Sequence, residues 1–193
     1  RSIVSVARFF TGGHCKRQDM LIRALPRLHE IESDIELHLI GSLPPDPQHP
    51  QYLVQCQEDA IGLPIHFNID ASPETMEKIY ASASVYWHGA GYDVDIATHP
   101  ERCEHFGITV VEAMAAGVVP VVVDNGGPAS IVQHAINRYC YQSEAQLIDF
   151  TRQLLSFDAT EVASLRDQAI MRAAIFTKEK FAENWAQLLS GTR

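Results

Sequence analysis

The chain alternates between short apolar runs rich in β-branched residues and longer segments with apolar residues at helical spacing. The run Val118–Val123 is almost continuously apolar, which is typical of a strand covered on both faces. Lys16–Ile31 carries its apolar residues three or four positions apart, as an amphipathic helix does. The alternation predicts an α/β fold, a doubly wound, Rossmann-like parallel sheet. Strands are expected at Ser2–Ala7, Ile35–Ile40, Pro64–Ile69, Ser84–His88, Val118–Val123 and Tyr139–Tyr141.

The segments between these runs carry helical patterns and loops. Leu43–His49 is a proline-rich loop, and the stretch after the fourth strand is rich in Gly, Asp and His. Ligands of a doubly wound sheet bind beyond the carboxyl ends of its strands. The loops Arg8–Arg17, Gly89–Gly107 and Asp124–Ala129 leave those ends and are therefore the candidates for chemistry. Helices are expected at Lys16–Ile31, Gln51–Ile61, Pro73–Ala83, Phe106–Ala116, Gly126–His134, Glu144–Leu155, Glu161–Ile175 and Lys178–Leu189.

Composition fits a globular domain. Of the 193 residues, 46% are hydrophobic and 20% are charged, so the chain can bury a core and is not disordered. The net charge of −9 argues against a general binder of nucleic acid or of anionic membranes. The sequence has no run of about 18 apolar residues, which a membrane-spanning helix needs. We expect one domain over residues 1–193, because no repeat or composition shift divides the sequence.

The cysteines and the start of the chain bear on its cellular context. The four cysteines form no C-x-x-C pair, which favours reduced thiols in a cytoplasmic protein over a zinc site or a disulfide framework. The first residues do not have the pattern of a signal peptide, and we expect none. The chain begins with Arg1 and enters an apolar strand almost at once, so we expect a domain cut from a longer protein.

The first motif is RFFTGGHCKR at residues 8–17, between a strand and a helix. Arg8 and Lys16 stand on either side of Gly12 and Gly13. Amide groups at a helix N-terminus bind anions, and arginine and lysine add a planar fork and a mobile point charge. A phosphate or diphosphate would fit this loop. The motif is neither the dinucleotide fingerprint nor a P-loop, so a glycine turn with solvated cations is the alternative.

The second motif is EHFGITVVEAMAAG at residues 104–117, which opens the helix before the Val118–Val123 strand. Glu104 precedes this helix, and Glu112 lies about one and a half turns further in. The first amides of the helix can face an anion, and the two carboxylates can accept hydrogen bonds from sugar hydroxyls. Gly107 allows a ligand to approach the backbone closely. In the alternative, Glu104 only caps the helix and Glu112 faces solvent.

Together these motifs resemble the C-terminal, donor-binding domain of a retaining GT-B glycosyltransferase, most like glycosyltransferase family four. The most specific match is the Glu-x7-Glu element at residues 104–112 with the apolar strand that follows it. Three further matches occur in the same order as in the family: SVAR with a following lysine, HLIG ending at Gly41, and DNGGP at residues 124–128. The resemblance spans nearly the whole chain, and it implies one half of a GT-B enzyme.

The resemblance also implies roles for individual residues. Arg8 and Lys16 would hold the diphosphate of a nucleotide sugar and stabilise it as it leaves, and Glu104 would contact the transferred sugar near its reactive face. Backbone amides of residues 106–108 would meet the sugar hydroxyls, with Thr109 near the phosphates and Glu112 on the ribose. Backbone near residues 66 and 67 would edge the base. The implied donor contacts are Gly13, His66, Phe67, Phe106, Gly107, Ile108, Thr109 and Glu112.

The implied activity is transfer of a sugar from a UDP- or GDP-linked donor to an acceptor, with retention and without a metal or other cofactor. Asp93 and Asp95 have D-x-D spacing, but they belong to the irregular loop, and we expect no metal ligand among the site residues. The acceptor-binding N-terminal domain would be the partner of this chain and the only route to a membrane surface. Without it we expect weak donor binding and little turnover. The alternatives are a sugar-nucleotide epimerase of the same architecture and a non-catalytic nucleotide-binding module.

Overall fold

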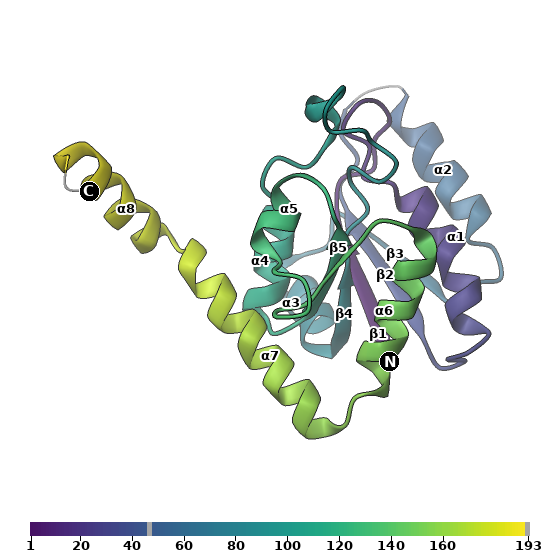
Figure 1. Ribbon diagram of the computed structural model, residues 1–193. Helices are drawn as coiled ribbons and strands as arrows, with labels where there is room; N and C mark the ends of the chain where they lie inside the picture. Colours follow the sequence, from purple (N-terminus) through teal and green to yellow (C-terminus); the bar gives the residue numbers. More distant parts are fainter. Residues whose placement is uncertain (46–47, 192–193) are drawn as a thin grey trace.

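The computed structural model describes residues 1–45 and 48–191, and it confirms the α/β class (Figure 1). One six-stranded sheet has the order β3-β2-β1-β4-β5-β6, and each neighbouring pair is parallel. This is the doubly wound arrangement, in which the strand order reverses between β1 and β4. The strands are β1 (Ser2–Val6), β2 (Glu36–Gly41), β3 (Ile65–Ile69), β4 (Ala83–Trp87), β5 (Val119–Val123) and β6 (Tyr139–Tyr141).

The helices follow the expected segments closely. They are α1 (Gln18–His29), α2 (His49–Asp59), α3 (Pro73–Ser82), α4 (Ile108–Ala115), α5 (Gly126–Ile131), α6 (Glu144–Ser156), α7 (Ala159–Ala173) and α8 (Lys178–Ser190), with short 3₁₀ turns at Pro100–Arg102 and Ala174–Phe176.

Several helix boundaries differ from the sequence prediction by two or three residues. Helix α1 is two residues shorter at each end than expected, α4 begins at Ile108 instead of Phe106, and α7 begins and ends two residues earlier than expected. Helix α2 begins two residues earlier than expected, and α5 stops at Ile131 because Val132 adopts an extended backbone. A bridge between His134 and Arg138 then leads into β6. The loop expected at Leu43–His49 includes residues 46 and 47, which lie outside the described residues.

Apolar side chains bury the sheet on both faces. Val121 and Val123 belong to the cluster on one face, whereas Val122 between them belongs to the cluster on the other. Helices α1 and α6 contribute to the first cluster through Leu25 and Leu147, and α3, α4 and α7 contribute to the second. The nearly continuous apolar pattern of β5 follows from this double coverage.

The chain leaves the domain through α7 and α8 (Figure 1). Helix α7 lies against α4, since Ala169 and Ala173 share a cluster with Val110 and Met114. Helix α8 extends beyond the sheet and exposes its large apolar side chains, Phe181, Trp185, Leu188 and Leu189. Within residues 1–45 and 48–191, none of the helices is long and apolar enough to cross a bilayer.

Candidate functional site

A cavity of about 250 Å³ opens at the carboxyl ends of β1 and β4. Arg8 and Lys16 enter it from the β1–α1 loop, Glu104 from the segment before α4, and Ile108 and Thr109 from the first turn of α4. The structure therefore brings together five residues that the two motifs singled out, although Lys16 and Glu104 are 88 positions apart in the sequence. The cavity lies at the reversal of strand order, where doubly wound folds bind their ligands.

Lys16 and Glu104 form an ion pair inside this cavity. The Lys16 ammonium donates a hydrogen bond to Glu104 Oε2 at 2.5 Å, and the two side chains are 15% and 24% exposed. Burial alone would raise the pKa of Glu104, but the hydrogen bond and the charge of Lys16 outweigh it and hold that pKa below its ordinary value. Glu104 is therefore ionised at neutral pH. Its negative charge balances the positive charge of Lys16 until another anion competes for the ammonium group.

The first turn of α4 is open toward the same space. Its N-cap is Gly107, which has a left-handed backbone with φ of 97° and no side chain to cap the helix. Amides at an uncapped N-terminus attract anions. The turn is anchored from below by Tyr86, whose hydroxyl lies 2.7 Å from Thr109 Oγ1 and donates to the Val6 carbonyl at 3.3 Å. This buried contact ties α4 to the end of β1.

A glycine pair supports the segment that carries Glu104. The Gly127 amide donates to the Glu104 carbonyl at 2.8 Å. A Cβ atom on Gly127 would lie 2.3 Å from the His105 carbonyl oxygen, and one on Gly126 would lie 2.5 Å from the Glu104 carbonyl oxygen. Only glycine allows α5 to approach so closely. The sequence marked these glycines as part of DNGGP but gave no sign that they position Glu104.

His88 is a buried histidine at the edge of the cavity. It is 6% exposed, and within the described chain its Nδ1 atom has no hydrogen-bond partner. Its backbone is fixed at both ends, since its amide donates to the Val121 carbonyl and its carbonyl accepts from the Tyr141 hydroxyl. Burial lowers the pKa of His88 to about 4, with Lys16 lowering it further and Glu104 opposing. His88 is therefore neutral at physiological pH.

This buried histidine predicts a loss of stability in mild acid. The unfolded chain takes up a proton near the ordinary pKa of 6.5, whereas the folded chain does so only near 4, so the free energy of unfolding falls as pH drops between these values. Between about pH 7 and about pH 5 this contribution amounts to about 2 kcal/mol. Urea unfolding of wild type and His88→Asn at both pH values measures it. Equal losses in the two chains would contradict the prediction.

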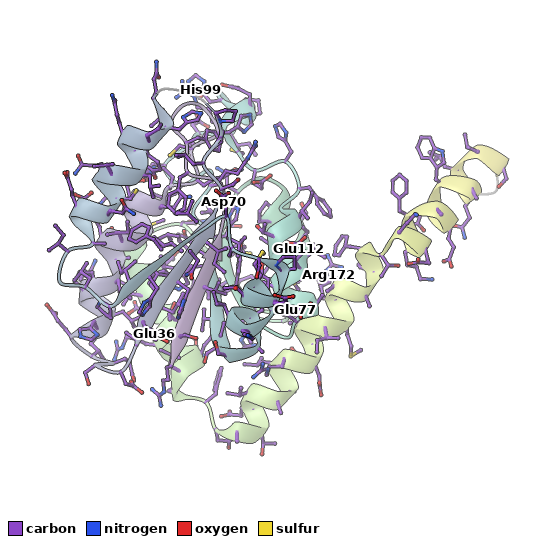
Figure 2. The ribbon with its side chains drawn as sticks, turned by 180° about the vertical axis from the view of Figure 1, so that it is seen from behind. Glu36, Asp70, Glu77, His99, Glu112 and Arg172 are labelled. Carbon is purple, nitrogen blue, oxygen red and sulfur yellow. The ribbon has the colours of Figure 1, made fainter. Side chains whose placement is uncertain are left out.

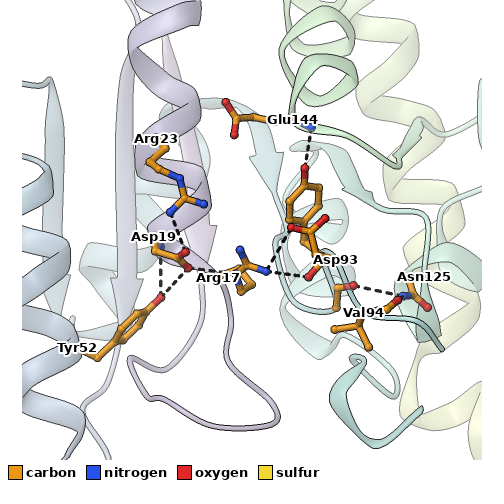
Figure 3. Close-up of polar contacts among 10 residues, drawn as sticks. Arg17, Asp19, Arg23, Tyr52, Asp93, Val94, Asn125 and Glu144 are labelled. Atoms are coloured by element: carbon orange, nitrogen blue, oxygen red, sulfur yellow. Dashed lines mark hydrogen bonds and ion pairs between the residues drawn. The ribbon is translucent and has the colours of Figure 1, made fainter. Parts of the chain in front are cut away.

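Arg17 makes contacts that hold neighbouring segments together (Figure 3). It donates to the Tyr92 carbonyl at 2.9 Å, stacks its guanidinium on the Tyr92 ring, and pairs with Asp19 and Asp93 at 3.3 and 4.0 Å. The Tyr92 hydroxyl in turn accepts from the Glu144 amide. These contacts join the β1–α1 loop to the loop after β4 and to the start of α6.

A second cavity, of about 450 Å³, adjoins the first and shares Arg8 and Thr109 with it. Gly41, Asp70 and Ala71 at the ends of β2 and β3 also line it. A Cβ atom at Gly41 would lie 2.0 Å from the Ala7 carbonyl oxygen, so the HLIG glycine is required where β1 and β2 end. Asp70 and Ala71 belong to neither motif and were not predicted to line the site. Their position directly after the apolar strand that ends at Ile69 is the feature of the sequence that could have identified them.

Other expected donor contacts lie further from these cavities. His66 and Phe67 are inside β3 and line neither of them; His66 contacts Glu36, and Phe67 lies 6.0 Å from the Phe9 ring. Gly13 lines another cavity, of about 420 Å³, together with Arg17 and the loop after β4. The nucleotide contacts of these three residues stay predictions.

Phe106 and Glu112 of the Glu-x7-Glu element are not among the residues that line the two adjoining cavities. Phe106 is 43% exposed and meets the Phe176 ring edge-on at 5.6 Å. Glu112 lies one turn of α4 beyond Ile108 and its side chain is exposed, although partial desolvation raises its pKa above the ordinary value. Figure 2 shows Glu112 on the same side of the molecule as Glu77 and Arg172. The ribose contact expected of Glu112 stays a prediction.

The sheet order, together with a cationic cavity at the open start of α4, defines the class: an α/β domain of the GT-B glycosyltransferase type. The chain belongs to the family of glycosyl transferases group 1, which matches residues 1–173. The expected family resemblance is thereby confirmed.

Curated relatives carry the same kind of description. A GDP-Man:Man(3)GlcNAc(2)-PP-Dol alpha-1,2-mannosyltransferase of Xenopus laevis is 25% identical over 95% of this chain and 37% of its own length. An uncharacterised glycosyltransferase of Methanocaldococcus jannaschii is 31% identical over 62% of this chain and 27% of its own length. The chain thus spans well under half the length of these relatives.

Solved structures share the fold. Anabaena HepE, solved in complex with UDP-glucose, has a TM-score of 0.75 and 19% identity, and the match covers 98% of this chain and 48% of that one. Staphylococcus aureus TarM, solved with UDP among its ligands, has a TM-score of 0.70 and 15% identity over 97% of this chain and 35% of that one. At these identities the likeness establishes the fold alone.

Proposed function

We propose that this chain is the donor-binding domain of a retaining glycosyltransferase and binds a nucleoside-diphosphate sugar. One observation carries the proposal: Arg8, Lys16 and the uncapped start of α4 converge on the cavity that also holds Glu104. Two cations and a row of amides suit a diphosphate, and a carboxylate beside them suits a sugar hydroxyl. The family match supports a transferase and gives no support to the epimerase alternative.

The diphosphate lies between Arg8, Lys16 and the amide of Thr109. Cleavage of the sugar–phosphate bond builds negative charge on the departing diphosphate. Cations and amides that are already in place stabilise that charge without a reorganisation step. Lys16 must first exchange its Glu104 partner for the phosphate, so donor binding releases Glu104 toward the sugar. The Phe106–Ile108 amides then hold further sugar hydroxyls.

The nucleoside occupies the second cavity, which adjoins the diphosphate position at Arg8 and Thr109. Backbone at Asp70 and Ala71 edges the base, a few positions beyond His66 and Phe67. Glu112 accepts hydrogen bonds from the ribose hydroxyls, one turn of α4 after Thr109. Backbone contacts of this kind are compatible with either UDP or GDP.

The reaction proceeds without a metal in this proposal. Asp93 and Asp95 have the spacing of a metal–diphosphate site, but both carboxylates are engaged locally. Asp93 pairs with Arg17, and Asp95 accepts from the Ala97 amide and the Thr98 hydroxyl. The charge of the diphosphate is met by Arg8 and Lys16 instead.

We also propose that the reaction retains the anomeric configuration, that a separate domain binds the acceptor, and that the protein is cytoplasmic. Retention is supported by the Glu-x7-Glu element, and proton NMR of the anomeric configuration of the first product tests it. The acceptor binds an N-terminal domain that lies outside residues 1–193, so this chain alone transfers little sugar. A cytoplasmic location is supported by the four free cysteines.

Calorimetric titration of the chain with UDP, GDP and ADP, first without metal and then with Mg²⁺, tests the proposal. We expect metal-independent binding of one of the three nucleotides, weakened in Arg8→Ala, Lys16→Ala and Glu112→Ala. Absence of binding in both the chain and the two-domain protein would overturn it. Binding that persists while the two-domain protein transfers no sugar would instead favour the non-catalytic binding module.

A further inference from the structure

Three potential metal ligands meet on a face of the sheet that the donor site does not use. Glu36 and His38 are two residues apart on β2, so their side chains leave the same face of the strand. His38 is the direct register partner of His66 on β3, which places His66 on that face as well. The neighbouring β2 residues Leu37 and Leu39 point the opposite way, into the core.

The Glu36 carboxylate contacts both imidazole rings, each through a different oxygen. Glu36 Oε1 lies 3.2 Å from His38 Nε2, and Glu36 Oε2 lies 3.1 Å from His66 Nε2. The two imidazole rings are stacked with centroids 4.7 Å apart and planes inclined by 22°. In the described part of the chain, this is the only group of three such residues whose ligand atoms all lie within 4.8 Å of one another.

These separations suit a metal ion. Two ligand atoms that are each about 2.0 Å from a tetrahedral Zn²⁺ lie about 3.3 Å from each other. The two histidines lie 3.2 and 3.1 Å from different oxygens of the Glu36 carboxylate, and one ligand atom from each residue lies within 4.8 Å of the others, so an ion must draw the three ligand atoms closer together. Imidazole nitrogen and carboxylate oxygen are common zinc ligands, and three protein ligands leave a position for water.

The cluster is also accessible and distant from the nucleotide site. The Glu36 and His66 side chains are 42% and 53% exposed, so an ion can reach them from solvent. Glu36 begins β2. The two adjoining cavities that contain Arg8 and Thr109, called the donor cavities below, lie past the carboxyl ends of the strands. Figure 2 shows Glu36 and Asp70 toward opposite ends of the sheet's strands.

We propose that Glu36, His38 and His66 bind a divalent transition-metal ion of the zinc type. The ion would join β2 to β3, which is an edge strand of the sheet formed by the described residues. The sequence predicted no metal ligand, because Glu36 and His66 are 30 residues apart and only the strand register brings them together.

Equilibrium dialysis of the chelator-treated chain against Zn²⁺ tests the proposal. We expect a single ion per chain with micromolar or tighter affinity, weakened about 100-fold in His38→Ala and in His66→Asn. Zn²⁺ should raise the thermal unfolding temperature of wild type by several degrees but leave that of the variants unchanged. Far-UV circular dichroism verifies that each variant is folded, and His66→Asn changes only a half-exposed side chain.

Two controls separate this site from other zinc binding. His99 pairs with Glu101 at 3.3 Å but has no second histidine, so His99→Ala should keep full affinity. Bound Co²⁺ should show no sulfur-to-cobalt charge-transfer band, because none of the ligands is a cysteine. Absence of binding at millimolar Zn²⁺, binding that survives loss of both histidines, or a thiolate band would each overturn the proposal.

Discussion

The Lys16→Met substitution is expected to weaken nucleoside-diphosphate binding about 10- to 100-fold and to lower sugar transfer by the two-domain protein about 10²–10³-fold. Methionine keeps the apolar stem of the side chain and removes only the ammonium group. The loss in turnover exceeds the loss in affinity because Lys16 meets more charge as the diphosphate departs. Calorimetry with the nucleotide and initial rates of transfer measure the two effects separately.

The ion pair between Lys16 and Glu104 leads to a second expected result. Lys16 is held by Glu104 before any donor binds, so a diphosphate must break that ion pair. Glu104→Gln should therefore tighten nucleotide binding several-fold while it abolishes most transfer, since Glu104 is the proposed sugar contact. In Lys16→Met the half-buried Glu104 carboxylate is left unpaired and repels the diphosphate. Adding Glu104→Gln to that variant should recover part of the lost affinity.

A surface cation provides the control. Arg23 on α1 is exposed and pairs with Asp19, outside both donor cavities. Arg23→Met changes the net charge as Lys16→Met does and should leave affinity and turnover within a factor of about two, because a surface ion pair is worth at most about 1 kcal/mol. Equal effects of the two substitutions would show that net charge, rather than the position of Lys16, governs binding.

The Gly127→Ala substitution is expected to reduce transfer about 100-fold while the domain remains folded. The new Cβ atom would lie 2.3 Å from the His105 carbonyl oxygen and 2.6 Å from the Phe106 Cα atom. Both neighbours are backbone, so the segment that carries Glu104 must move. A displacement of about 1 Å in a catalytic segment can cost about 10²-fold in rate. The overpacking should also lower the free energy of unfolding by about 1–3 kcal/mol.

Kinetics and urea unfolding of the same variant measure both effects. Ser130→Ala is the matched control, because Ser130 is exposed on the same short helix α5 and its backbone carbonyl, which accepts from Arg172, is unchanged. That variant should retain wild-type rate and stability. A Gly127→Ala protein with full transfer activity would show that α5 does not position Glu104.

Much of the fold was predictable, because it depends on local patterns. The β5 run is apolar on both faces, and both faces are covered in the structure. The two motifs also identified Arg8, Lys16 and Glu104 from residue type and from their places beside helix starts. The parallel sheet then brings the motifs together, because both follow carboxyl ends of strands.

The remaining features depend on contacts that no local pattern encodes. The Lys16–Glu104 pair and the burial of His88 arise only when β1, β4 and α4 assemble. The base-edge residues were expected inside the β3 strand, at His66 and Phe67. The strand ends at Ile69 as predicted, but the cavity is lined by Asp70 and Ala71 just beyond that end, whereas the nucleotide contacts of His66 and Phe67 stay predictions.

The order of strands in the sheet sets the order in which a newly synthesised chain can fold. One edge of β1 pairs with β2, but its other edge waits for β4, whose Ala83 pairs with Ser2. Synthesis at about 5–20 residues per second leaves that edge open for several seconds. All five residues of β1 are buried in the finished sheet. The unpaired edge of β1 is therefore open to non-native strand pairing until residues near 87 have left the ribosome.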